Sequence, residues 1–191
     1  MFFGFFFRTF VVCTFAARFL QASCSQAINN QYIIIMQQKT IHISYVEYSS
    51  PAELPAEDRQ LLEKAIDATA TAYSPYSHFC VGAAVLMANG EIVTGSNQEN
   101  VAYPSGLCAE RTAMFAASVQ HPGVAMRKIA IVGKNAQGQL CPATPCGACR
   151  QVMSEYQDLA KQNIQVILYH NDGNVLVLDG IDSLLPLRFS F

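Results

Sequence analysis

The sequence has no basic stretch. Across its 191 residues, 12 lysines and arginines stand against 14 acidic residues, giving a formal net charge of −2 and a pI near 6.0. A protein that binds a polyanion usually carries a basic cluster or stripe. The charge balance therefore argues against nucleic acid as a partner.

Long apolar runs and internal repeats are also missing. The apolar stretches near the N-terminus are broken by Arg8 and Arg18 and are too short to cross a bilayer. They make a poor secretory signal, because a basic start is absent. We expect residues 1–35 to be an extension outside the fold, residues 36–191 to form a single domain, and no membrane attachment. The chain length suits one domain with a full core.

Metal-ligand spacing is absent from all four histidines and from four of the seven cysteines. An odd number of cysteines in a chain of this size argues against a disulfide framework. A reducing compartment, the cytoplasm, is the expected location. The residues set aside on these grounds are His42, His78, His121, His170, Cys13, Cys24, Cys80 and Cys141.

The other three cysteines have the spacing of a metal site. Cys108 begins the run Cys-Ala-Glu, and Cys146 and Cys149 form a Cys-x-x-Cys pair directly after Pro145. Three protein thiolates leave the fourth position of a tetrahedral zinc ion open, which is typical of catalytic rather than structural zinc. A Cys-x-x-Cys pair also occurs in redox dithiols and in structural zinc folds, so these two alternatives stay open.

Turn signals and hydrophobic periodicity predict an α/β domain of three layers, α/β/α. We expect a mixed sheet of five strands, and the short turn at 170–173 requires its last two strands to be antiparallel. Asn89-Gly90 predicts a hairpin, and Leu159 is expected to face inward from the last helix. The predicted strands are 81–88, 91–94, 128–133, 164–169 and 175–178, and the predicted helices are 55–73, 109–121 and 145–159.

The cysteines fall at predicted helix starts, where the positive end of the helix dipole favours thiolates. Arg111 and Arg150, each next to a cysteine, are candidates to hydrogen-bond the sulfurs. Glu110 lies two residues from a ligand and is expected to carry protons. In zinc deaminases a glutamate that is not a ligand serves as general acid and base, so this combination predicts hydrolytic deamination.

The sequence resembles the cytidine deaminase family, in its small, three-cysteine, homotetrameric form. The resemblance covers most of the chain from the first predicted helix onward. It rests on runs that occur in order, namely 79–84, 97–100, 103–106, 108–113, 145–151 and Leu184-Leu185-Pro186.

The resemblance implies one zinc ion per subunit, held by the three cysteines, with Glu110 as the proton shuttle. It implies that Asn97 and Glu99 bind the ribose, that Phe79 stacks on the pyrimidine, and that the backbone of Ala109 contacts the base. It also implies that neighbouring subunits of a homotetramer complete each pocket. That role falls to Tyr103 and Phe189.

The expected reaction is deamination of cytidine and deoxycytidine to the uridine forms, as part of pyrimidine salvage. An ionised Glu99 can accept two ribose hydroxyls but repels a phosphate, which favours nucleosides over nucleotides. A deaminase of another small aminated ring, such as blasticidin S, is the nearest alternative. A non-catalytic zinc protein and a dithiol redox protein are the others.

Overall fold

The computed structural model describes residues 37–190 of the chain, so the expected extension at 1–35 lies outside the described residues. The chain divides into two units, residues 1–40 and 41–191, and every described helix and strand belongs to the second. Of the first unit, residues 37–40 are exposed and have no regular secondary structure. None of the helices within 37–190 has the length and apolar character needed to cross a membrane.

The described elements alternate between strands and helices. The strands are β1 (Val46–Tyr48), β2 (Cys80–Met87), β3 (Ile92–Ser96), β4 (Met126–Lys134), β5 (Leu140–Cys141), β6 (Gln165–Tyr169) and β7 (Val175–Asp179). The α-helices are α2 (Ala56–Ala68), α3 (Ala109–Gln120) and α4 (Gly147–Ala160). Short 3-10 turns occur at Pro51–Glu53, Thr69–Thr71, Tyr103–Ser105, Asn171–Gly173 and Ile181–Ser183.

The strands form one mixed sheet with the order β1-β7-β6-β4-β2-β3, and β5 pairs with β4. Among the strands within residues 37–190, β4 and β6 are the one parallel pair, while β6 and β7 are antiparallel as predicted. The sheet of the described region has seven strands rather than the expected five. The additions are β1, which pairs with β7 over three residues, and β5, which pairs with β4 over two. Pairings this short leave no clear periodicity in the sequence.

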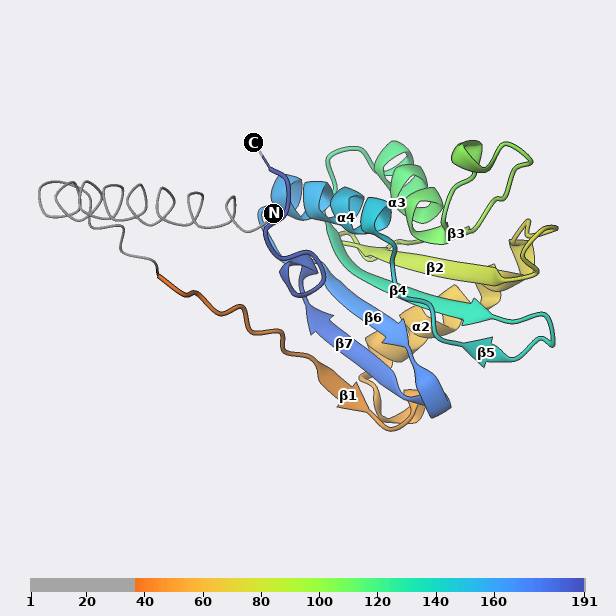
Figure 1. Ribbon diagram of the computed structural model, residues 1–191, viewed down its shortest axis with the longest axis horizontal. Helices are drawn as coiled ribbons and strands as arrows, with labels where there is room; N and C mark the ends of the chain where they lie inside the picture. Colours follow the sequence, from red (N-terminus) through yellow and green to blue (C-terminus); the bar gives the residue numbers. More distant parts are fainter. Residues whose placement is uncertain (1–36, 191) are drawn as a thin grey trace, which may run out of the picture. The chain divides into compact units, whose positions relative to one another are not determined.

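Helices cover both faces of the sheet, which confirms the three-layer prediction. Figure 1 shows α3 and α4 together on one face and α2 on the other. On β4, Ile129 and Ile131 pack in the core beneath α3 and α4, whereas Ala130 and Val132 pack in the core beneath α2. The alternation follows the two-residue period of a strand that is buried on both faces.

Helix α3 lies unusually close to the sheet. A β-carbon added at Gly95 of β3 would lie 2.4 Å from the backbone nitrogen of Ala113 and 2.9 Å from the carbonyl oxygen of Ala109. Only glycine permits this approach of one main chain to another. Ala113 and Ala117, both fully buried, complete the contact face with small side chains. The first turn of α3 is therefore held at a fixed depth over the sheet.

Two expectations about helices were wrong. The first predicted helix was expected to reach Tyr73, but α2 ends at Ala68 and passes into a 3-10 turn. Leu159 was expected to face inward, yet it is 68% exposed, while Met153 on the same helix is fully buried. The predicted hairpin at Asn89-Gly90 is confirmed by the antiparallel pairing of β2 with β3.

Candidate active site

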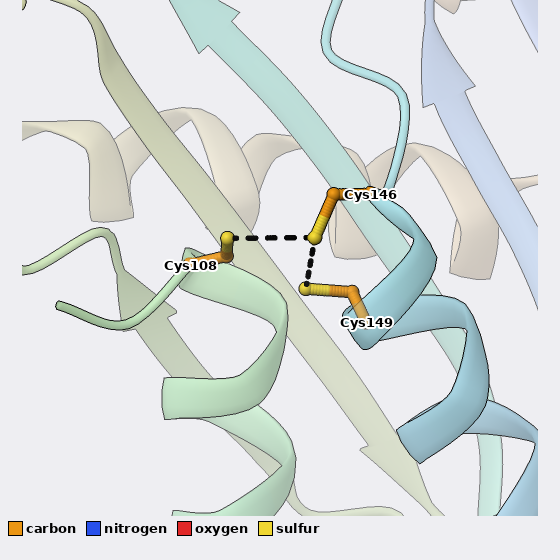
Figure 2. Close-up of side chains that lie close together, drawn as sticks. All are labelled: Cys108, Cys146 and Cys149. Carbon is orange, nitrogen blue, oxygen red and sulfur yellow. Dashed lines mark hydrogen bonds between the residues drawn. The ribbon is translucent and has the colours of Figure 1, made fainter. Parts of the chain in front are cut away.

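The cysteines predicted as ligands lie together at the starts of two helices. Cys108 is the N-cap of α3, Cys146 is the N-cap of α4, and Cys149 lies in the first turn of α4. The Sγ atoms of Cys108 and Cys146 are 3.8 Å apart, and those of Cys146 and Cys149 are 3.5 Å apart. Figure 2 shows the three side chains pointing toward one another from the two helices.

The geometry of this sulfur cluster fits a zinc ion. All three Sγ atoms lie within 4.8 Å of one another, and within residues 37–190 no fourth side chain of a ligating type joins the group. Three thiolates at two helix N-termini match the charge and softness that zinc requires, and they leave one coordination position open. The neighbouring Cys149 thiol and the Arg111 guanidinium lower the pKa of Cys108 to about 5, against the opposing effect of burial.

Glu110 lies beside the sulfur cluster without being part of it. The residue is only 4% exposed, in the first turn of α3, and it contributes to the wall of a pocket. Burial raises the pKa of its carboxyl group, and the charge of Cys108 adds to the effect. A carboxyl group with a raised pKa at the wall of a pocket is a candidate for proton transfer.

The two arginines next to the cysteines behave differently. Arg111 Nη2 lies 3.9 Å from the Sγ atom of Cys108, which is the expected contact to sulfur. Arg150 instead donates to two carbonyl oxygens, those of Pro145 and Leu184, each at 2.7 Å. Because Pro145 immediately precedes Cys146, Arg150 fixes the backbone that carries the ligand and does not bond a sulfur. Sequence adjacency alone could not separate these two orientations.

A pocket of about 550 Å³ opens beside the cysteines and Glu110. Four of the residues expected to bind substrate contribute to its wall. These are Phe79, Asn97, Glu99 and Tyr103.

Neither of the remaining two residues, Ala109 with its expected backbone contact and Phe189 with its expected place in a neighbouring subunit's pocket, lines this pocket. Ala109 is fully buried. Phe189 is 67% exposed, and its carbonyl oxygen accepts a hydrogen bond of 3.0 Å from Gln151 of α4.

The side chains of Asn97 and Glu99 are held by backbone groups. Asn97 accepts a hydrogen bond from the Val81 amide at 2.7 Å and donates one to the Phe79 carbonyl at 2.9 Å. Glu99 Oε2 accepts from the amide of Tyr76 at 2.9 Å. These contacts leave each side chain with further hydrogen-bonding capacity toward the pocket.

Several residues of the pocket wall were missed by the sequence reasoning. Apart from Val81, which lies in β2, they come from loops, whose position depends on partners far away in the chain. Leu107, for example, pairs through its backbone with Gln98, and Ser77 contacts Glu99. The only sequence signal for Ser77 was its place two residues before Phe79, a residue already expected to bind substrate. The missed residues are Ser77, Val81, Gln98, Asn100, Gly106, Leu107, Pro142, Ala143 and Thr144.

Two known proteins are similar to this chain in sequence. The cytidine deaminase of Halalkalibacterium halodurans is 42% identical over 134 residues, which cover 70% of this chain and 95% of that protein. The cytidine deaminase of Sporosarcina psychrophila is 45% identical over 131 residues, covering 69% and 90% respectively.

Solved structures agree with these relatives. The crystal structure of cytidine deaminase from Burkholderia pseudomallei has a TM-score of 0.58 at 42% identity, and covers 68% of this chain and 97% of that one. The crystal structure of cytidine deaminase from Mycobacterium tuberculosis has a TM-score of 0.55 at 34% identity, and covers 69% and 96%.

A family model completes the comparison. The model described as the cytidine and deoxycytidylate deaminase zinc-binding region matches residues 55–164, which include the three cysteines and Glu110. The match spans more than half of the chain and contains the whole sulfur cluster. The chain therefore belongs to the cytidine and deoxycytidylate deaminase family.

Proposed function

We propose that this protein is a zinc-dependent aminohydrolase that converts cytidine and deoxycytidine to uridine and deoxyuridine with release of ammonia. One observation carries the proposal: a three-thiolate group with room for a further ligand lies beside the buried Glu110 at the wall of one pocket. Zinc in such a site acidifies water and so supplies the nucleophile for hydrolysis at neutral pH.

Glu110 performs the proton transfers in this proposal. Its carboxylate takes a proton from the attacking water and delivers it to the ring nitrogen, and it then passes the remaining proton of that water, from the newly added hydroxyl group, to the departing amino group. Water and cytidine thereby give uridine and ammonia with no proton left over. The raised pKa of Glu110 suits a group that must be protonated and deprotonated within one turnover.

The remaining wall of the pocket supports a nucleoside substrate. Phe79 offers an aromatic face for the pyrimidine, and Asn97 and Glu99 offer polar groups for the sugar. The Glu99 carboxylate repels a phosphate, which favours a nucleoside over a nucleotide. The relatives named above carry the name cytidine deaminase, which supports the same substrate class.

Exposed apolar side chains support a homotetramer in which neighbours complete each pocket. Tyr103 is 71% exposed at the pocket mouth, and Val119 and Leu159 project apolar surface from α3 and α4. In this proposal Tyr103 and Phe189 reach the pocket of an adjacent subunit. The mass of the particle in solution, measured by light scattering, tests the subunit count.

We also propose a cytoplasmic role in pyrimidine salvage. The thiolates of Cys108, Cys146 and Cys149 must stay reduced to bind metal, which suits a reducing compartment. A free nucleoside substrate is consistent with salvage.

The substitution Glu110→Gln tests the reaction. We expect turnover of cytidine to disappear while the zinc content, measured by mass spectrometry of the metal, stays at one ion per subunit. Glu63→Gln, a change of the same kind on the exposed face of α2, serves as the control and should leave turnover intact. Full activity in Glu110→Gln would reject the proposed role and favour a non-catalytic zinc site.

Competing substrates test the specificity. Rates with cytidine, deoxycytidine, cytidine monophosphate and blasticidin S should rank the two nucleosides first. A preference for blasticidin S would reassign the protein to a different aminated ring, and a zinc-free enzyme with a reversible Cys146 to Cys149 disulfide would indicate a redox protein.

A further inference from the structure

A tight turn before β2 connects two of the pocket residues. His78 N donates to the Ser74 carbonyl oxygen at 3.0 Å, which closes the turn. Within it, Ser77 makes contacts in two directions: its hydroxyl oxygen accepts a hydrogen bond from Phe79 N at 3.1 Å, and its amide donates to Glu99 Oε2 at 3.3 Å. Ser77 itself lines the pocket.

The hydroxyl group of Ser77 has one proton left to donate. A hydroxyl can donate one hydrogen bond and accept two, so accepting from Phe79 N leaves its own O–H available. The nearby acceptor is Glu99: the Ser77 side chain is the largest cause that lowers the pKa of the Glu99 carboxyl group, ahead of the Tyr76 amide. One serine thus stabilises the ionised carboxylate and orients the backbone that carries the aromatic ring.

The backbone of the turn is held in an uncommon conformation. His78, between Ser77 and Phe79, has a φ of +55°, in the left-handed region that few residues other than glycine adopt, although histidine does so more often than most. Such a conformation persists when surrounding contacts determine it. Here the hydrogen bond from Phe79 N to the Ser77 hydroxyl spans this residue.

We propose that Ser77 is a positioning residue for the deamination reaction. Its single side chain and amide hold the aromatic ring that faces the base and the carboxylate that faces the sugar at a fixed separation. The inference rests on the proposed function, since it assigns the base to Phe79 and the ribose hydroxyls to Glu99. Its effect should therefore depend on whether the substrate has those hydroxyls.

The test compares Ser77→Ala with Ser77→Thr on two substrates, in the zinc-loaded full chain. For cytidine, we expect Ser77→Ala to raise KM about tenfold with kcat within about twofold, since the hydroxyl that accepts from Phe79 N and stabilises the Glu99 carboxylate is lost, while the amide bond to Glu99 stays. Ser77→Ala should change the KM for 2′,3′-dideoxycytidine little. If that compound is not turned over, its inhibition constant against cytidine is measured instead. Ser77→Thr keeps the hydroxyl and should restore the KM for cytidine.

A double-mutant cycle with Glu99→Gln gives a second readout. If Ser77 acts through Glu99, then Ser77→Ala should have little further effect on KM for cytidine once Glu99 is changed. Ser77 is exposed, so the variants should fold, and melting temperatures check this.

The possible failures are distinguishable. Absence of cytidine turnover in the zinc-loaded unmodified protein would overturn the proposed function. If the unmodified protein turns over cytidine but Ser77→Ala weakens both substrates equally, only the positioning role would be overturned. The same holds if the effects of Ser77→Ala and Glu99→Gln on KM are additive. Either result would show that Ser77 merely shapes the turn.

Discussion

The tip of the Phe79 ring lies against Gly133, close to where a β-carbon would stand. A β-carbon built at Gly133 would be 2.8 Å from Phe79 Cζ and 3.1 Å from Cys141 Sγ. Since real β-carbons do not approach other atoms this closely, the missing side chain of Gly133 provides the space that the ring occupies. The orientation of this pocket residue thus depends on a glycine of the neighbouring strand.

Substitution of Gly133 by alanine should therefore displace the ring. We expect Gly133→Ala to lower kcat/KM for cytidine and to reduce the free energy of unfolding by about 1–3 kcal/mol, which is typical of overpacking. Steady-state kinetics and urea unfolding measure the two effects. In a Phe79→Ala background the added methyl group should cost less, because the ring is absent. An identical cost in both backgrounds would show that the ring does not depend on Gly133.

Removal of the metal should make the cysteine ligands reactive toward alkylation, and it should do so to different extents. After treatment with a chelator we expect cytidine turnover and thermal stability to fall, and added zinc to restore both. Iodoacetamide should then modify the exposed Cys146 faster than the buried Cys149, and zinc should protect both. Cys80 and Cys141, outside the cluster, serve as internal controls with reactivity independent of zinc. Peptide mass spectrometry after alkylation distinguishes these sites, and unprotected Cys146 in zinc-loaded protein would contradict the assignment.

An ionic cluster connects the start of α2 to β4 and should make stability depend on pH. Lys128 Nζ lies 2.8 Å from Glu57 Oε2 and also pairs with the buried Asp58. The hydrogen bond from Lys128 is the main cause that lowers the pKa of Glu57 below its ordinary 4.5. Stabilisation from a lowered carboxyl pKa is fully present above the ordinary value and is lost as the pH falls through the folded value.

For Lys128 the pKa is raised rather than lowered, so its contribution to stability is lost at high pH instead of low pH. Burial acts to lower the pKa of Lys128, but hydrogen bonds to Asp58 and Glu57 outweigh it and raise the pKa above 10.5. That contribution is present below pH 10.5 and is lost as the pH rises through the folded value. Between these limits both contributions are present.

Lys128→Met should therefore destabilise the protein most near neutral pH, by about 3–5 kcal/mol, because it leaves Asp58 buried without a partner. Urea unfolding from about pH 3 to about pH 8 should show the difference from the unmodified protein shrinking below pH 4.5. Arg127→Met is the matched control, since Arg127 is 42% exposed and contacts only Glu57 in this cluster. A Lys128 effect that stays constant across the pH range would show that packing, not charge, is lost.

The domain boundary is open to a direct test. Every residue of the buried apolar core described here lies between Leu54 and Ile181. We therefore propose that a chain begun at Met36 folds and deaminates cytidine with unchanged kcat/KM. Melting temperature and turnover of this shorter chain, beside those of the full chain, provide the measurement. A large loss of either would show that residues 1–35 contribute to the enzyme.

Local signals predicted the elements of this fold well, and tertiary packing decided the rest. Asn89-Gly90 specified its hairpin because the turn preference is contained in the two residues. The inward face of α4 was less predictable: Leu159 fits the helical period, yet its side chain is 68% exposed. The strand β1 lies in a β-branched and aromatic stretch, residues 40–48, but only its last three residues pair with β7, and that pairing sets its bounds.

The residues of the candidate site were likewise predictable only in part. The meeting of Cys108, Cys146 and Cys149 could be predicted because metal chemistry restricts both residue type and spacing. Ser77 could not, since its contact to Glu99 joins a turn to a loop 22 residues further along the chain. Side-chain direction was also beyond reach, as shown by Arg150, which bonds carbonyl oxygens although it is adjacent to a ligand.

The approach of α3 to Gly95 has a consequence for how the enzyme tolerates change. The backbone of α3 lies against Gly95 itself, so any side chain at this position would push the helix outward. The helix has Cys108 at its N-cap and Glu110 in its first turn, so such a shift would move both residues relative to Cys146 and Cys149 of α4. The spacing of these four residues is therefore sensitive to a single hydrogen atom that stands in place of a side chain.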